Sequence, residues 1–233
     1  MKSLTTYITE KMVYTKVTAS KIKYIPESTE ELRSIISNKI KEEGPDANLN
    51  DIDVSHITDM SNLFSPDFCG DISSWDVSNV TNMSSMFDGC EKFNCDLSKW
   101  DVSKVEDMTQ MFRFCREFEG KGLDKWNTNM FYACGLMFKK CSSLETLDLS
   151  NWKMGKVQST NEMFYDCYNL TTIGDVSNWD VSNVKDMQSM FYNCGKLECD
   201  CINWKLHIRC NISKLSTYTT RRIFRGPKRN IKI

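Results

Sequence analysis

The chain has 233 residues, of which 40% are hydrophobic and 26% are charged, and these are the proportions of a folded protein. Its 30 Lys and Arg residues nearly balance its 31 Asp and Glu residues, so the net charge of −1 excludes a protein that is polycationic or polyanionic throughout. No apolar run approaches the roughly 20 residues that a membrane helix needs, so we expect no membrane span.

Residues 1–26 are predicted to form a flexible leader. Its short apolar run is broken by Glu10 and Lys11, which makes a poor secretory signal. A cytoplasmic or virion-associated location is therefore expected rather than secretion. The segment MKSLTTYITE resembles the short amphipathic leaders of tailed-phage head proteins, some of which are clipped after a glutamate, here Glu10. An ordinary frayed terminus is the alternative.

A helix is predicted over residues 27–44, within an N-terminal helical cap of residues 27–51. Ser28 is the expected N-cap and Glu31 stands at the capping-box position, while Gly44 and the proline after it stop the helix. The apolar face is formed by Leu32, Ile35, Ile36 and Ile40. We expect this helix to cover the open end of the repeats that follow.

Residues 52–216 contain a repeated sequence. WDVSNVTNMSSMF begins at Trp75, and similar segments follow at spacings of 25, 26, 26, 27 and 25 residues. The repeat tryptophans are Trp75, Trp100, Trp126, Trp152, Trp179 and Trp204. An earlier unit starts at Ile52, which gives about seven units with degraded ends, as repeat arrays usually have.

The hydrophobic period changes inside each unit. Around Trp100, the apolar residues Leu97 and Val102 alternate with polar ones, which predicts a short strand. The next apolar residues lie at offsets 0, 3, 6, 7 and 10, which is the stripe of a helix; they are Val105, Met108, Met111, Phe112 and Cys115. The units together predict an α/β repeat solenoid of short parallel strands that alternate with short helices.

Serine residues stand at the predicted starts of these helices. Ser103 with Glu106 three residues later is a capping-box pattern, and Ser78 and Ser182 could cap alone. The repeat Met and Trp residues are predicted to fill the core of the stack.

The 11 cysteines are predicted to be free and mostly buried in a reducing compartment. Five of them follow the repeat Phe by three residues and should form a column; they are Cys90, Cys115, Cys141, Cys167 and Cys194. Cys194, Cys199, Cys201 and Cys210 are clustered but lack paired C-x-x-C spacing. Zinc binding at these C-terminal cysteines is therefore a weaker alternative to core packing, and no metal or other cofactor is predicted.

The W-D-V-S-N-V-T-N-M-S-S-M-F motif, with Cys three residues after the Phe and a following F-N-x-D-L-S-x-W, resembles the repeats of BspA-like leucine-rich-repeat surface proteins. The resemblance extends from about Ile52 to Leu215. It implies a leucine-rich-repeat-like solenoid and a role in adhesion or protein recognition, and relatives are often cell-surface proteins. It implies no reaction.

The outward positions after each Trp are the predicted partner face. They are Asp76, Ser78, Asp101, Ser103, Asn127, Asn129, Lys153, Gly155, Asp180, Ser182, Lys205 and His207. In a repeat array such positions form a regular grid on one side. The alternative is that Asp and Ser only satisfy turns and helix starts in every repeat.

Residues 217–233 are a predicted basic tail, and from Cys201 onward there are nine Lys or Arg residues and no acidic residue. Arg221, Arg222, Arg225, Lys228 and Arg229 are its main cations. The tail is expected to hold an acidic partner or a phosphate backbone, with a solvated tail as the alternative.

Neither His56 nor His207 has a nucleophile at recognisable spacing, and no catalytic motif is present. We therefore expect no enzymatic activity. The leading prediction is a non-catalytic protein–protein interaction or adhesion module. The alternative is a structural or packaged phage-type protein whose leader and tail direct assembly.

Overall fold

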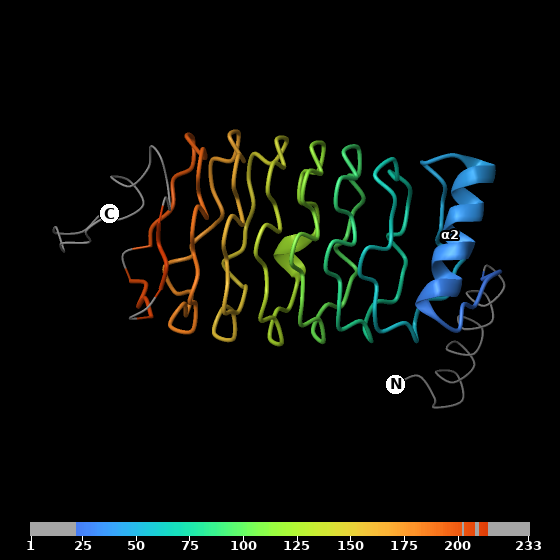
Figure 1. The fold of residues 1–233 in the computed structure, drawn as a ribbon, viewed down its shortest axis with the longest axis horizontal. Helices are drawn as coiled ribbons and strands as arrows, with labels where there is room; N and C mark the ends of the chain where they lie inside the picture. Colours follow the sequence, from blue (N-terminus) through green and yellow to red (C-terminus); the bar gives the residue numbers. More distant parts are fainter. Residues whose placement is uncertain (1–21, 202, 208–209, 214–233) are drawn as a thin grey trace, which may run out of the picture.

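A computed structural model describes residues 22–201, 203–207 and 210–213. Its helices are α2, Thr29–Glu43, and a short 3₁₀ helix, η1, Leu123–Lys125. The rest of the described chain winds into irregular coils that lie side by side in a row, with α2 at the end that comes first in sequence (Figure 1). Each coil is referred to below by its repeat tryptophan.

Helix α2 forms where the sequence predicts a helix. The Ser28 hydroxyl accepts a hydrogen bond from the Glu31 amide at 3.2 Å, and Glu31 in turn accepts one from the Glu27 amide at 2.8 Å. Gly44 ends the helix with a φ of 99°, a left-handed value that suits glycine. Leu32 and Ile36 are buried, so this face of α2 contributes to the core.

The predicted α/β repeat solenoid, with its leucine-rich-repeat-like strands and helices, is wrong. Across residues 22–201, 203–207 and 210–213 there is no continuous strand, and the β-pairing between neighbouring coils consists of isolated parallel bridges. One column of these bridges joins Asp59, Asn82, Asp107, Ala133, Ser159, Asp186 and Asn211. The segments predicted as short helices are series of turns.

Left-handed residues explain why turns replace the predicted helices. In the Trp75 coil, the amides of Met86 and Cys90 donate to carbonyls three residues earlier, at 3.2 and 3.0 Å, as in β-turns. The amide of Ser85 instead donates to Thr109 of the next coil at 2.8 Å. Ser85 and Gly89 have φ values of 55° and 80°, which interrupt a right-handed helix.

The same pair of left-handed residues recurs in the following coils, at Gln110 and Phe114, Leu136 and Lys140, Glu162 and Asp166, and Ser189 and Asn193. Successive β-turns, closed by hydrogen bonds between residues three apart, place the apolar side chains on the inner side at the spacing of a helical stripe. The predicted capping serines therefore have no helix to cap, and the Ser103 amide donates to Asp101 Oδ1 at 3.0 Å.

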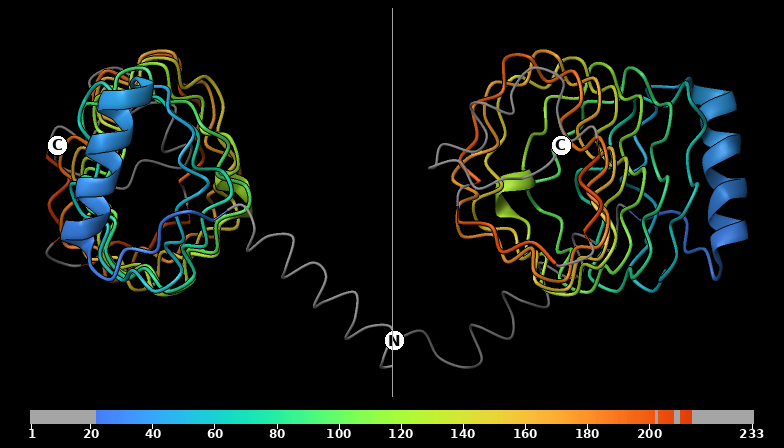
Figure 2. Two further views of the ribbon diagram at one scale, coloured as in Figure 1. Left: turned by 90° about the vertical axis from the view of Figure 1, so that its right-hand side faces the viewer. Right: turned by 60° about the vertical axis from the view of Figure 1, so that its left-hand side comes forward.

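Apolar columns fill the interior of the stack. Seen along the row, the coils superimpose as a ring with α2 across one end (Figure 2). The repeat Trp, Met and Phe side chains point inward and are buried, which confirms their predicted core role. The main aromatic column consists of Phe64, Phe87, Phe112, Phe138, Phe164 and Phe191, with neighbouring ring centroids 5.2 to 5.8 Å apart.

Each repeat tryptophan also ties its coil to the preceding one. Its indole N–H donates to a backbone carbonyl of that coil at 2.8 to 3.3 Å. The donors Trp75, Trp100, Trp126, Trp152, Trp179 and Trp204 pair with Leu49, Ile72, Leu97, Leu123, Leu149 and Val176. A buried indole needs such a partner, so tryptophan here supplies both apolar area and a fixed register.

The repeat cysteines form the predicted column and have a similar role. The thiols of Cys115, Cys141 and Cys167 donate to carbonyls of the preceding coil at 3.0, 2.9 and 2.9 Å. Burial raises the pKa of Cys90 and Cys194 to about 12, so both stay protonated and able to donate. A small apolar side chain with a weak donor fits this inner position.

Candidate functional site

The predicted partner-face residues all lie in the described part of the chain. Eight of them are exposed, and Ser78, Ser103, Gly155 and His207 are half-buried. We call the surface that they share with their neighbours the coil face. It is formed by the exposed side chains of residues 76–81, 101–106, 127–132, 153–158 and 180–185, together with Lys205.

In three coils the Asp and Ser of the coil face satisfy local turns. The Oδ1 atoms of Asp76, Asp101 and Asp180 accept the amide two residues later at 3.0, 3.0 and 3.1 Å. The serine hydrogen bonds lower the pKa of Asp101 and Asp180. These carboxylates remain exposed, but one oxygen of each already stabilises its own backbone.

The Trp126 and Trp152 coils depart from this arrangement. Lys153 replaces the turn aspartate and Gly155 replaces the turn serine. The amide of Lys153 donates to the buried Thr128 hydroxyl of the preceding coil at 2.7 Å. The exposed side chain of Lys153 therefore has no part in a turn of this kind.

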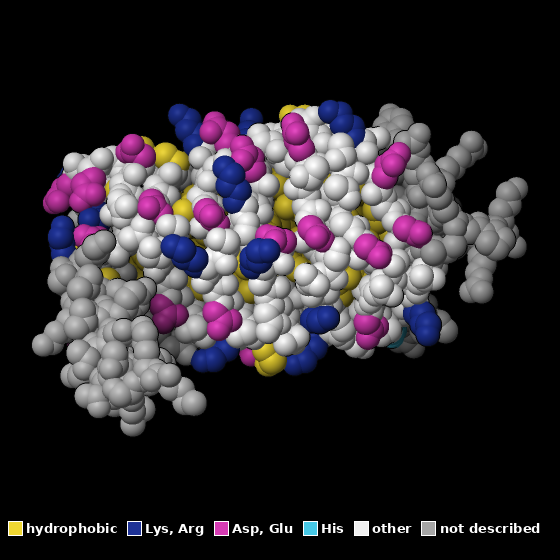
Figure 3. Space-filling model, turned by 180° about the vertical axis from the view of Figure 1, so that it is seen from behind, with side chains coloured by type: hydrophobic (Ala, Val, Ile, Leu, Met, Phe, Trp, Pro, Cys, Tyr) yellow, Lys and Arg dark blue, Asp and Glu magenta, His cyan; other side chains and the backbone are white. Residues whose placement is uncertain are grey.

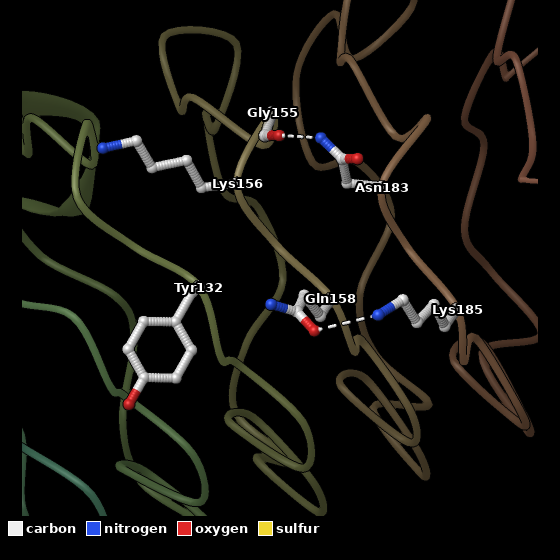
Figure 4. A pocket seen from close by; sticks show the side chains of 6 residues that line it. All are labelled: Tyr132, Gly155, Lys156, Gln158, Asn183 and Lys185. Atoms are coloured by element: carbon white, nitrogen blue, oxygen red, sulfur yellow. Dashed lines mark hydrogen bonds between the residues drawn. The ribbon is translucent and has the colours of Figure 1, made fainter.

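A hollow of about 420 Å³ lies on the coil face at these two coils and the next. Tyr132, Gly155, Lys156, Gln158, Asn183 and Lys185 line it. The side chains of Lys156 and Lys185 both extend toward the preceding coil (Figure 4). Gly155 contributes only backbone, at the position that Ser78, Ser103 and Ser182 occupy in three other coils.

Hydrogen bonds hold the C-terminal side of the hollow. Asn183 donates its amide N–H to the Gly155 carbonyl at 2.6 Å, and Lys185 Nζ donates to Gln158 Oε1 at 3.3 Å (Figure 4). Lys156 Nζ lies 3.2 Å from the thioether of Met130, which is a weak acceptor. The lining of the hollow thus includes one exposed aromatic ring and two lysine side chains, whose ammonium groups contact different coils.

Of the six residues that line the hollow, only Gly155 stands at a predicted partner-face position, because the predicted positions are the first and third after each Trp. The missed signal is the variation at the sixth position, which is Thr81, Glu106, Tyr132, Gln158 and Lys185 in successive coils. These side chains are exposed beside the column of parallel bridges, so the same backbone frame presents a different group in each coil.

The clustered cysteines are not gathered into a metal site. Cys199 and Cys201 lie with their sulfurs 3.0 Å apart, whereas the Cys194 thiol donates to Phe164 O. Among the described residues, no group of three or more His, Cys, Asp or Glu is arranged to hold a metal ion. The basic tail from Arg221 to Arg229 lies outside the described residues, as does the Glu10 segment of the leader.

The sequence profile of a family described as "Mycoplasma protein of unknown function, DUF285" matches residues 31–146 and again residues 115–221. The chain belongs to this family. Each of the two overlapping matches spans several coils, in keeping with the repeated structure. No curated protein and no solved structure matches the chain. In the part of the chain that the structure describes, no helix is long and apolar enough to cross a membrane.

Proposed function

We propose that this chain is a non-catalytic protein–protein interaction or adhesion module, and that its coil face contacts a protein partner. The observation that carries the proposal is that each coil has a buried side that is nearly constant and an exposed side that varies. The Trp, Met, Phe and Cys columns are buried and hold the stack together, whereas the coil face is exposed and varies from coil to coil. Variable side chains on a repeated frame are typical of repeat proteins that recognise partners.

The resemblance of the repeat motif to BspA-like surface proteins supports the same proposal, since it implies adhesion or protein recognition. The Trp152 coil is the best place for specificity. Its Lys153 side chain is exposed and its backbone amide is satisfied by Thr128, so Lys153 can be changed without loss of a turn.

Site-specific photocrosslinking tests this proposal. A photoreactive residue replaces Lys153 on the coil face or, as the matched control, exposed Ser143 outside it. Each full-length chain is irradiated in an extract of the cells that produce it, and adducts are identified by mass spectrometry. The proposal expects a defined protein adduct from position 153 and not from position 143. Adducts of the same proteins at both positions, or none at position 153, would contradict it.

A further inference from the structure

We propose that Cys199 and Cys201 form a thiol modification site, which a low-molecular-weight disulfide such as oxidised glutathione converts into an intrachain disulfide. The site lies in the Trp204 coil, which is the last described coil, at the end of the row opposite α2 (Figure 1). Both cysteines are free thiols in the structure. The inference concerns the interior of this coil and is independent of the proposed function of the coil face.

The first argument is that the two sulfur atoms need little movement to form a bond. They lie 3.0 Å apart, and a disulfide bond is about 2.05 Å long, so the sulfurs have to approach by only about 1 Å. Cys199 and Cys201 are buried, whereas Asp200 between them is exposed. Side chains thus alternate between inside and outside along this segment, and both thiols are on the inner side.

The second argument concerns what holds these thiols. A repeat cysteine such as Cys115 donates to a backbone carbonyl of the preceding coil at 3.0 Å, whereas Cys199 and Cys201 contact each other. Sulfur is a weak acceptor, so little stabilisation is lost when this contact becomes a bond. Cys201 also stands where the two preceding coils carry Leu149 and Val176. The second thiol is therefore not part of the repeated pattern.

The third argument concerns access. Trp204 is 8% exposed, the largest fraction among the repeat tryptophans, and Cys199 is 6% exposed, whereas the cysteines of the repeat column are 0 to 1% exposed. On the side of the molecule shown in Figure 3, hydrophobic side chains, cysteines included, are visible mainly in gaps between polar groups. Thiols inside the row are thus shielded from this side. Units near an end of a repeat array open more readily than central ones, so the Trp204 coil is the place where a thiol is reached.

The exchange takes place in two steps. The Cys199 thiol loses its proton to solvent, and its thiolate attacks one sulfur of oxidised glutathione, which releases one glutathione thiolate and leaves a mixed disulfide. Cys201 then loses its proton, and its thiolate attacks the Cys199 sulfur and releases the second glutathione. The two glutathione thiolates take up the two protons. Two protein thiols are thus oxidised by two electrons while one glutathione disulfide is reduced to two thiols.

The order of the two steps follows from exposure. Burial, with a further contribution from the contact with Cys199, raises the pKa of Cys201, so Cys201 is the poorer first nucleophile. Its attack on the mixed disulfide is within the chain, where the two sulfurs are already neighbours. Glutathione should therefore leave the parent chain soon after it binds.

Peptide mapping with trypsin tests the proposal, because Lys196 and Lys205 flank the pair and leave both cysteines in one peptide, residues 197–205. The folded full chain is incubated with oxidised glutathione, and the remaining thiols are blocked with iodoacetamide in denaturant before digestion and mass spectrometry. Cys95 is the internal control. It has the place of Cys199 in the Trp100 coil, but Leu97 follows it where Cys201 would stand.

The proposal expects peptide 197–205 to lose two hydrogen atoms and to carry neither glutathione nor a blocking group, and dithiothreitol to restore both thiols. Cys95 should carry glutathione or a blocking group. The pair should oxidise at least about tenfold faster than the buried column thiol Cys141 is modified. In Cys201→Ser, whose fold is checked by circular dichroism, glutathione should remain on Cys199.

Three results would overturn the proposal. The first is a parent peptide 197–205 that stays fully blocked by iodoacetamide. The second is a parent peptide that keeps glutathione as Cys201→Ser does, because the two sulfurs would then not react with each other. The third is oxidation of Cys141 at the same rate as the pair, because unfolding of the whole chain would then explain the reaction.

Discussion

The Trp100 and Trp152 coils have equivalent buried residues but differ on the coil face. In the Trp100 coil, one carboxylate oxygen of Asp101 accepts a hydrogen bond from the amide of Ser103. In the Trp152 coil, Lys153 and Gly155 stand in place of this Asp and Ser, and the Lys153 amide donates to the Thr128 hydroxyl of the preceding coil. A repeat can therefore change its surface chemistry by losing the Asp–Ser turn while it keeps the buried columns that hold the stack together.

The largest expected effect tests whether the interior of the two coils is equivalent. Trp100→Ala and Trp152→Ala should each lower the free energy of unfolding by about 3–5 kcal/mol, because each leaves a cavity and removes the indole hydrogen bond to the preceding coil. Urea denaturation followed by circular dichroism measures both. A loss below about 1 kcal/mol in one coil only would break the equivalence.

The thiol column should make stability depend on alkaline pH. Burial raises the pKa of Cys90 and Cys194 from 9.0 to about 12, so between these values the unfolded thiols ionise while the folded ones stay protonated. The thiol contribution is complete below pH 9 and is lost as the pH rises from 9 toward 12, by about 1.4 kcal/mol per pH unit for each thiol.

Cys194→Ser supplies the control for this dependence, because serine does not titrate in the same range. Denaturation midpoints measured from pH 8.5 to about 10.5 should fall less steeply in the variant than in the parent chain. The same slope in both proteins would show that the Cys194 thiol does not contribute.

A smaller effect distinguishes the Trp100 coil from the Trp152 coil on the coil face. Asp101→Ala should lower the free energy of unfolding by about 1 kcal/mol, because the Ser103 amide loses its acceptor. Lys153→Ala should change it by less than about 0.5 kcal/mol and yet weaken capture of the partner. Thermal denaturation and partner capture are measured on the same preparations. Equal destabilisation by the two changes would mean that Lys153 also has a structural role.

Asp101 of the Trp100 coil should also make the stability of the chain depend on acidic pH. The serine hydrogen bonds hold the pKa of Asp101 below its usual range, so its stabilising contribution is present near neutral pH and is lost as the pH falls through the folded pKa. The parent chain should therefore lose more stability on acidification than Asp101→Asn, whose side chain keeps an acceptor oxygen but does not titrate. Denaturation between neutral and acidic pH measures the difference, and parallel curves would contradict the assignment.

Much of the packing could be predicted from the sequence, but the secondary structure could not. Helix α2 was predictable because Ser28, Glu31 and Gly44 act locally. The inner side chains from Val105 to Cys115 have helical spacing, yet turns with left-handed residues at Gln110 and Phe114 produce the same inward stripe. Neither residue is a glycine, so the sequence carries no clear signal of its backbone conformation.

The candidate site was only partly predictable for a similar reason. The exposed positions after each Trp follow from the repeat register, as Lys153 and Asp101 show. The hollow depends on how Tyr132, Gly155 and Lys185 of three separate coils lie together, which requires the stacking distance and register between coils. Those are set by hydrogen bonds between coils that no single repeat reveals.

The most direct test of the central claim is to restore the common sequence in the Trp152 coil. Lys153→Asp combined with Gly155→Ser recreates the Asp–Ser pair of the Trp100 coil, and the reverse change, Asp101→Lys with Ser103→Gly, is the control. The measurement is the amount of the crosslinked partner that each immobilised full-length chain retains. Retention of the partner should fall about tenfold in the restored chain and change little in the control. Undiminished retention by the folded, restored chain would contradict it.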